Sequence, residues 1–329
     1  MANIVILGAG GWGIAFGIMC LRSGHSITVW TPFEKERDTI LENREHKALL
    51  EGVKIPECVN VTCDISVVSD AEIVIIAVPS SAVYQTAERI KGLLKEDAVV
   101  ICLSKGLDGE RVMLMNELIE AQLPGCRLCV VSGPSHAEEV ARNMPTAVVA
   151  AAEDEELAKY VQREISCDTF RIYTSTDVIG VETAGAVKNV MALAAGVLDG
   201  MGYQDNTKAA LMTRGMSEIA DLGIAMGGKR KTFLGLAGFG DLVVTCTSMH
   251  SRNRRAGILI GQGHSAEETL KLIGMTVEGY GTTKAAYQFA RSKNIEMPIV
   301  TEMYRILYEG KDPNVALGEL LSRPMKAED

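Results

Sequence analysis

One lysine of this sequence stands where a charged side chain is costly, inside a helical stretch of small and apolar residues. Lys188 and Asn189 interrupt a run that otherwise continues as Val190–Leu193. A buried ammonium group is unfavourable when unpaired, so such a lysine usually has a charged partner or a function. Desolvation lowers the pKa of a lysine, which lets it act as a general base toward an alcohol near neutral pH. Glu182 and Asp241 are the candidate partners, and the residues alone leave catalysis and a structural ion pair equally open.

A cluster of basic residues at 251–255 predicts an anion site at the start of a helix. Three arginines and one asparagine follow Ser251 there. Guanidinium groups match phosphate oxygens in a fork geometry, so the cluster favours a phosphate ligand over a merely solvated basic helix start. The formal net charge of −9 argues against nucleic acid or an anionic membrane surface as a partner. A local basic cluster is still compatible with an anionic substrate.

Two loops that follow predicted strands add polar groups to the candidate site. Lys105 stands between a strand end and Gly106, where it could meet a phosphate or a carbonyl oxygen, and an exposed lysine is the alternative. Ser135 could cap a helix over Ala137–Arg142, whose free backbone N–H groups would suit an anion. An ordinary helix cap explains Ser135 equally well, and we interpret the neighbouring His136 as a surface residue.

A glycine motif near the N-terminus predicts a dinucleotide site. The pattern G-x-G-x-x-G at 8–13 follows a predicted strand, opens a helix and precedes a second strand that ends at Trp30. Gly8 permits a tight turn, Gly10 lets the backbone approach a pyrophosphate, and Gly13 lets the helix pack closely on the strand. A glycine-rich turn without a ligand would explain Gly13 but not Gly10.

Eight cysteines are scattered through the chain, and no metal site is predicted. Cys126 and Cys129 form a single C-x-x-C, whereas zinc needs a second pair or two well-spaced histidines. The cysteine usage favours reduced thiols in a cytosolic protein. No apolar run approaches the roughly 20 residues of a membrane span. We therefore expect a cytoplasmic protein without membrane insertion.

The elements that position these residues begin with a strand–helix alternation in the first half of the chain. Such alternation predicts an α/β fold, a Rossmann-type doubly wound and mostly parallel sheet with helices on both faces. The predicted strands are Asn3–Leu7, Ser26–Trp30, Val61–Asp64, Ile73–Val78, Ala98–Leu103, Arg127–Val131, Thr146–Ala150 and Thr169–Tyr173. The predicted helices among them include Trp12–Ser23, Glu34–Leu50 and Ala82–Leu94.

The second half of the chain is predicted to be helical. Its helical patterns are Val178–Met201, Asn206–Met226, Glu267–Ile273, Lys284–Ser292 and Thr301–Tyr308. A chain of 329 residues is long enough for two domains with separate cores. We expect an NAD(P)-binding Rossmann-type domain over residues 1–178 and an all-helical substrate-binding and catalytic domain over residues 179–329.

Taken in order, the motifs GAGGWG, SKG, SGPSHAEEV, VETAGAVKNVMALAAG, GLAGFGDL, SRN and VEGYGT closely resemble the bacterial-type NAD(P)-dependent glycerol-3-phosphate dehydrogenase family. The resemblance covers nearly the whole chain. It implies a catalytic cleft between the two domains and interconversion of dihydroxyacetone phosphate and sn-glycerol 3-phosphate by hydride transfer with NAD or NADP. It also implies a homodimer that supplies glycerol 3-phosphate for phospholipid synthesis.

The resemblance implies roles for single residues as well. Lys188 matches the proton acceptor for the substrate's C2 hydroxyl, and we expect Asp241 to orient it. The implied substrate contacts are Lys105, Gly133, Ser135, Lys188, Asp241, Ser251, Arg252 and Asn253. The implied cofactor contacts are Gly8, Gly10, Gly11, Trp12, Gly13, Lys105, Ala137, Arg252, Thr276 and Glu278.

The end of the second strand departs from the family pattern. Many members carry a basic residue two positions after the tryptophan that ends this strand, and this chain has Pro32 there. An NAD-specific enzyme usually places an acid at this strand end to bind the ribose 2′-hydroxyl. Thr31 stands there instead, and we expect Lys35 and Arg37 to offset the charge of Glu34. We therefore expect NADPH to be accepted and NADH to be usable as well.

Two other functions fit parts of the pattern. A related lysine-dependent β-hydroxyacid dehydrogenase, acting on a substrate such as 6-phosphogluconate, would share the fold and the lysine. A dinucleotide sensor without turnover would keep the glycine motif but need not keep Lys188 and Asp241 beside a phosphate clamp. Arg252 and Asn253, with the SGPSHAEEV and GFGDL motifs, favour the smaller three-carbon substrate.

Overall fold

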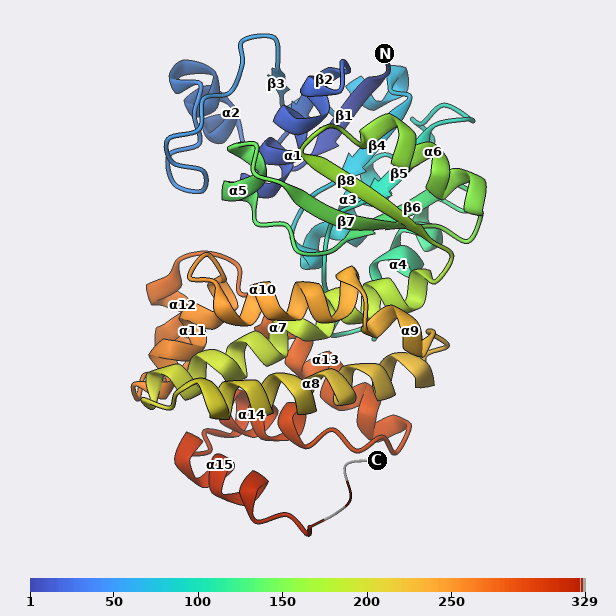
Figure 1. The fold of residues 1–329 in the computed structure, drawn as a ribbon. Helices are drawn as coiled ribbons and strands as arrows, with labels where there is room; N and C mark the ends of the chain where they lie inside the picture. The colour runs from blue at the N-terminus through green and yellow to red at the C-terminus, as the bar shows by residue number, and fades with distance from the viewer. Residues whose placement is uncertain (326, 328–329) are drawn as a thin grey trace.

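The computed structural model describes residues 1–325 and 327, which form a sheet with its covering helices above a helical body (Figure 1). The eight strands are β1 Asn3–Leu7, β2 Ser26–Trp30, β3 Asn60–Thr62, β4 Ile73–Ile76, β5 Val99–Cys102, β6 Arg127–Ser132, β7 Thr146–Ala151 and β8 Phe170–Ser175. They form one sheet in the order β3-β2-β1-β4-β5-β6-β7-β8. Neighbouring strands are parallel except β6 and β7. The predicted mostly parallel sheet is confirmed.

The sheet is buried on both faces, which explains why its central strands are apolar throughout. All four residues of β4 and all four of β5 are buried. Because side chains alternate along a strand, Ile4 and Ile6 of β1 point into one core while Val5 and Leu7 point into the other. Helices α1 (Gly11–Arg22), α5 (Ala137–Ala141) and α6 (Glu155–Ile165) contribute to the first core. Helices α3 (Val83–Arg89) and α4 (Met115–Gln122) contribute to the second.

Two helices of the first half are shorter than predicted. Helix α2 covers Glu34–Asn43 rather than extending to residue 50, because Arg44 adopts a left-handed conformation with φ 49° that ends it. Helix α3 ends at Arg89, shortly before Gly92, whose φ of +75° turns the chain. A left-handed residue therefore closes α2 directly, whereas α3 is closed at Ile90, with φ −96°, before the turn at Gly92.

The second half is built of helices from residue 178 onward, as Figure 1 shows. These are α7 Val178–Gly200, α8 Asp205–Ala225, α9 Arg230–Phe233, α10 Asp241–Thr247, α11 Arg252–Gly261, α12 Ala266–Ile273, α13 Glu278–Ser292, α14 Pro298–Glu309 and α15 Pro313–Leu321, with a π-helical turn at Leu236–Gly240. Helix α7 is the central element. It has the length and composition of a membrane span, but 94% of its most apolar window is buried inside the protein. It is therefore the core helix of this half.

Helix α7 belongs to two cores at once. Val178 and Val181, in its first turn, pack into the core beneath the sheet together with Ile76. From Ala184 onward its apolar residues pack into the core of the helical half. Asp177 caps the start of this helix by accepting a hydrogen bond from the backbone N–H of Gly180, with an N–O distance of 3.0 Å.

Helices α7 and α11 touch along their backbones. A Cβ atom added to Gly257 of α11 would lie 2.1 Å from the carbonyl oxygen of Leu193, and one added to Gly196 of α7 would lie 2.1 Å from that of Arg254. Only glycine permits this approach. The contact holds the start of α11, with Arg252 and Asn253, against the middle of α7.

Candidate active site

A carboxylate with two lysine partners lies where the sheet half meets the helical half. Asp241, the first residue of α10, is 1% exposed. The Nζ atom of Lys188 donates to its Oδ1, and the Nζ atom of Lys105 lies 2.8 Å from its Oδ2. Lys188 comes from α7 and Lys105 from the loop after β5. Of the two acids that the sequence offered as partners of Lys188, Asp241 is therefore the one that pairs with it.

The other candidate acid has a different role. Both carboxylate oxygens of Glu182 accept a hydrogen bond from the backbone N–H of Asn116, at 3.1 and 3.2 Å. Glu182 therefore caps the start of α4 from the helical half, and burial raises its pKa to about 8. Glu182 thus forms a second contact between the two halves, and Asp241 is the acid that pairs with Lys188.

Local structure fixes the position of Asp241. The π-helical turn before it needs glycine, since a Cβ atom on Gly238 would lie 2.2 Å from the carbonyl oxygen of Phe233. One helical turn later, the Thr245 hydroxyl donates to the Asp241 carbonyl oxygen at 2.6 Å and accepts from Lys188 at 2.8 Å. Thr245 was not among the site residues predicted from the sequence. Its spacing of four residues from Asp241 is the signal that could have identified it.

Burial and neighbouring charges set the protonation of this cluster. Burial, with a smaller effect from the charge of Lys105, lowers the pKa of Lys188 to about 8, against the opposing effect of Asp241. Burial alone would raise the pKa of Asp241, but the ammonium groups of Lys105 and Lys188 hold it below its ordinary value. The site therefore combines an ionised carboxylate with an amine that titrates just above neutral pH.

The loop after β6 adds acceptors and a hydroxyl to the cluster. Lys105 donates to the Gly133 carbonyl oxygen at 2.9 Å, and the Ser135 hydroxyl donates to the same oxygen at 2.8 Å. Gly133 has φ +146°, and a Cβ atom there would lie 2.9 Å from the Cα of Val148. The prediction that Ser135 caps a helix is wrong. Its hydroxyl turns back to Gly133, and α5 begins at Ala137 without a side-chain cap.

The residues of the predicted phosphate cluster lie at the start of α11, and their surroundings differ. Ser251 caps the helix by accepting from the backbone N–H of Arg254 at 3.2 Å. The Arg254 guanidinium is engaged, with Asp199 at 2.7 Å and the Thr247 carbonyl oxygen at 2.6 Å. Arg252 is exposed, and within residues 1–325 and 327 its guanidinium has no hydrogen bond or ion pair. It is the arginine of this cluster most available to an anion.

Asn253 lies at the junction of three helices. Its side chain donates to the Oδ1 atom of Asn189 at 2.9 Å and accepts from the backbone N–H of Gly279 at 2.9 Å. The residue after Arg252 is thereby tied to the residue after Lys188. This connection holds the start of α11 against α7 next to Lys188.

The glycine loop has the shape that a dinucleotide requires. Gly8 has φ +124°, and a Cβ atom there would lie 2.8 Å from the Ala77 carbonyl oxygen. A Cβ atom on Gly13 would lie 2.1 Å from the Gly8 carbonyl oxygen, whereas one on Gly10 would meet nothing within 4 Å. Gly10 thus faces open space at the start of α1, where backbone N–H groups suit a pyrophosphate. The loop fits the cofactor predicted for it.

The remaining predicted cofactor residues come from several elements. Gly11 is covered by Leu49, whose carbonyl oxygen would lie 2.9 Å from a Cβ atom on Gly11. Trp12 is half-buried on α1, edge to face with Phe16 at a centroid distance of 5.5 Å. Thr276 is exposed just before α13.

Glu278 joins the two halves beside the loop after β4. As the first residue of α13, it accepts hydrogen bonds from the backbone N–H of Ser80, at 3.2 Å, and from the Ser80 hydroxyl. The alternative that Glu278 merely caps its own helix does not account for these contacts. Ser80 was not predicted as a site residue, because only the fold brings residues this far apart together.

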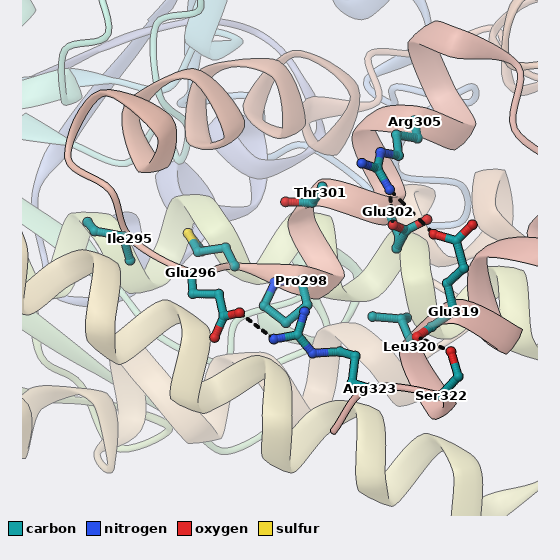
Figure 2. Close-up of a pocket in the computed structure, with 11 residues that line it drawn as sticks. Ile295, Glu296, Pro298, Thr301, Glu302, Arg305, Glu319, Leu320, Ser322 and Arg323 are labelled. Atoms are coloured by element: carbon teal, nitrogen blue, oxygen red, sulfur yellow. Dashed lines mark hydrogen bonds and ion pairs between the residues drawn. The ribbon is translucent and has the colours of Figure 1, made fainter. Parts of the chain in front are cut away.

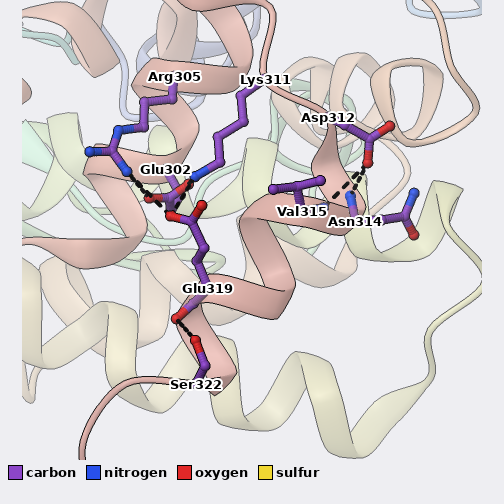
Figure 3. A network of polar contacts seen from close by, with 8 residues as sticks. All are labelled: Glu302, Arg305, Lys311, Asp312, Asn314, Val315, Glu319 and Ser322. Atoms are coloured by element: carbon purple, nitrogen blue, oxygen red, sulfur yellow. Dashed lines mark hydrogen bonds and ion pairs between the residues drawn. The ribbon is translucent and has the colours of Figure 1, made fainter.

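A cavity of about 490 Å³ lies in the helical half beside Pro298 and Arg323 (Figure 2). Charged residues line it, and Figure 3 shows how they pair. Glu302 and Glu319 each accept from Arg305 and from Lys311. Arg323 pairs with Glu296. The predicted site residues do not line this cavity.

The comparisons with known proteins agree along the whole chain. Residues 3–158 match the model of the NAD-dependent glycerol-3-phosphate dehydrogenase N-terminus, and residues 177–318 match that of the C-terminus. The chain is 44% identical to glycerol-3-phosphate dehydrogenase [NAD(P)+] of Fusobacterium nucleatum, covering 100% of this chain and 99% of that protein. It is 49% identical to the protein of the same name from Thermoanaerobacter sp., covering 99% and 98%.

A solved structure agrees with these relatives. The crystal structure of glycerol-3-phosphate dehydrogenase from Coxiella burnetii superposes with a TM-score of 0.94 at 37% identity. It covers 98% of this chain and 99% of that one. The similarity therefore extends over both halves of the fold and over the junction that holds the lysine cluster.

Proposed function

The chain belongs to the NAD-dependent glycerol-3-phosphate dehydrogenase family, and we propose that it interconverts dihydroxyacetone phosphate and sn-glycerol 3-phosphate, with NAD or NADP as the cofactor. The observation that carries this proposal is the buried pairing of Lys188 and Lys105 with Asp241. It supplies a proton-transfer group whose pKa, about 8, suits an alcohol–ketone conversion. The neighbouring start of α11 supplies a free guanidinium for a phosphate group.

Proton transfer at the substrate's C2 oxygen is assigned to Lys188. During oxidation, its neutral amine takes the proton of the C2 hydroxyl. During reduction, its ammonium form gives a proton to the carbonyl oxygen, and solvent restores the proton afterwards. A bound nicotinamide cofactor supplies the hydride exchange at C2. Asp241 stays ionised and holds the Nζ atom of Lys188 in place, with Thr245 as the second fixed contact.

Substrate binding is assigned to the polar groups around this lysine. Arg252 would hold the phosphate group in fork geometry, which fixes a three-carbon chain at one end. Lys105 has a free third donor direction beyond Asp241 and Gly133. The Ser135 hydroxyl donates to the same Gly133 carbonyl oxygen as Lys105, so the two groups are neighbours.

The cellular role proposed is the supply of glycerol 3-phosphate for phospholipid synthesis, in the cytoplasm and without membrane insertion. A homodimer is proposed on the family resemblance. Light scattering on the purified protein tests the assembly, since a monomer mass at working concentration would contradict it.

An absorbance assay of the reduced nicotinamide tests the activity. The purified protein is given dihydroxyacetone phosphate, dihydroxyacetone or, in the oxidative direction, 6-phosphogluconate. We expect turnover with the first, weak turnover with the second and none with the third. Turnover with 6-phosphogluconate would support the related hydroxyacid dehydrogenase instead, and cofactor binding without any turnover would support a sensor.

A further inference from the structure

The carboxylate of Glu36, an acid not predicted as a site residue, contacts the chain at the end of β2. The Thr31 hydroxyl, directly after this strand, donates to the carboxylate of Glu36 in the first turn of α2. The Nε2 atom of His46 lies 3.3 Å from the other carboxylate oxygen. Thr31 is fully buried and the side chain of Glu36 is 28% exposed. The carboxylate is therefore held in one place by contacts on both oxygens.

The place is the one where a Rossmann fold meets the adenosine ribose. The backbone N–H of Gly8 donates to the carbonyl oxygen of Trp30 at 2.9 Å, so the end of β2 lies against the start of the glycine loop. In such folds the ribose attached to the pyrophosphate lies at the end of the second strand, where an acid accepts a hydrogen bond from the 2′-hydroxyl. Glu36 reaches this end from the following helix, through Thr31.

The charges around Glu36 favour a hydroxyl over a phosphate. The hydrogen bond from His46 lowers the pKa of Glu36, against the opposing effect of its partial burial, so the group is ionised at neutral pH. Of the two basic residues expected to offset Glu34, Arg37 points its guanidinium to Asp38 instead, at 2.7 Å, and Lys35 is exposed. Glu34, the acid considered from the sequence, is exposed. A 2′-phosphate would therefore meet a fixed negative charge.

We propose that Glu36, held by Thr31 and His46, is the residue that makes this enzyme prefer NADH over NADPH. It accepts a hydrogen bond from the ribose 2′-hydroxyl of NADH and repels the 2′-phosphate of NADPH. The proposal rests on the proposed function. Both cofactors were expected to be usable, and the proposal adds that NADH is used better than NADPH.

The test compares kcat/KM for dihydroxyacetone phosphate reduction with each cofactor at one ionic strength. The parent should prefer NADH by about 10- to 100-fold, as expected for a like charge placed against a phosphate. In Glu36→Gln the preference should fall to within about three-fold, mainly through better use of NADPH. Glu34→Gln is the matched control, because it removes one acid from the same helical turn. It should leave the ratio unchanged.

A binding measurement separates this proposal from the proposed function. Calorimetry with adenosine 5′-monophosphate and adenosine 2′,5′-bisphosphate needs no turnover, and the parent should bind the bisphosphate more weakly. Glu36→Gln should reduce that difference, and Thr31→Val, a smaller change, should reduce it in part. Discrimination without dihydroxyacetone phosphate turnover would uphold Glu36 and refute the proposed function. A parent that prefers NADPH, or a ratio that Glu36→Gln leaves unchanged, would overturn the assignment of Glu36.

Discussion

Lys105 reaches Asp241 across 136 residues of chain, with a distance of 2.8 Å between the Nζ and Oδ2 atoms. The contact joins the loop after β5 to the start of α10, so the site is assembled from both halves of the molecule. It also means that Asp241 keeps one cationic partner when the other lysine is removed. Because Lys105 would still pair with Asp241, Lys188 can be replaced without leaving a buried carboxylate unpaired.

Replacing Lys188 by Met tests the proton-transfer assignment. The apolar side chain suits the buried helix, and Lys105 still neutralises Asp241, so we expect folding and cofactor binding to persist. Turnover should fall by about 10²-fold or more, the usual worth of general acid–base catalysis. Steady-state kinetics and cofactor titration give the two readouts. Turnover within a few-fold of the parent would refute the assignment.

Replacing Asp241 by Asn tests the charge coupling through a pH profile. With the pKa of Lys188 at about 8, glycerol 3-phosphate oxidation should rise with pH through that value and ketone reduction should fall. Asp241 raises the pKa of Lys188, so its removal should move both profiles to lower pH. Thr245→Val removes a hydrogen bond but no charge and serves as the control. If both variants shifted equally, geometry rather than charge would govern the profile.

Replacing Arg252 by Ala tests the phosphate contact. Productive binding of dihydroxyacetone phosphate should weaken by roughly 2–4 kcal/mol, as expected when a bidentate charge contact is lost. Dihydroxyacetone lacks the phosphate, and kcat/KM for this poor substrate should change little. Equal losses with both ketones would assign Arg252 to the cofactor or to the fold.

Replacing Glu182 by Gln tests a pH-dependent contribution to stability. Burial raises the pKa of this carboxyl from an ordinary value of 4.5 to about 8. The contribution of this carboxyl group to the free energy of unfolding is therefore fully present below pH 4.5 and is lost as the pH rises through about 8. The melting temperature of the parent should fall more between about pH 5 and pH 8 than that of Glu182→Gln.

The control for this stability measurement is a second buried acid. Burial also raises the pKa of Glu218, to about 7, and this residue caps the start of α14. Glu218→Gln should flatten the same curve over a lower pH range. Parallel melting curves for the parent and Glu182→Gln would show that the Glu182 carboxyl is ionised in the folded state at low pH.

Replacing Gly257 by Ala tests the contact between α7 and α11. The new Cβ atom would lie 2.1 Å from the Leu193 carbonyl oxygen, so the helices must separate. We expect a loss of about 1–3 kcal/mol of unfolding free energy, as in overpacked cores. The matched control is Gly281→Ala on α13, where a Cβ atom meets nothing within 4 Å and should stabilise the helix by roughly 0.5–1 kcal/mol. Equal effects would contradict the contact.

The sequence predicted the strands well because each is a short β-branched run between turn residues. It missed the end of α2, which stops at the left-handed Arg44, and the end of α3, which stops at Ile90. No local pattern distinguishes an Arg that continues a helix from one that ends it. Such ends are settled by the contacts of the following chain.

The site was predictable by residue type and less so by contact. Lys188 was identified from its cost in an apolar helix, but the choice between Glu182 and Asp241 depended on which acid the fold brings to it. The Ser135 hydroxyl donates to Gly133 in its own loop instead of capping a helix, because a hydroxyl can rotate toward whichever backbone group is near. Glu36 was overlooked because it follows the strand end by several residues and reaches back only through Thr31.

Helix α7 starts in the core beneath the sheet, with Val178 and Val181, and continues into the core of the helical half. A boundary at residue 178 therefore falls at the start of a helix that belongs to both cores, and not in a linker. A sheet half cut there would lose part of its own core, and a helical half would expose apolar side chains at its start. The two halves thus share helix α7. In any lineage that exchanged one half for another, the first turn of α7 would have had to change with the sheet.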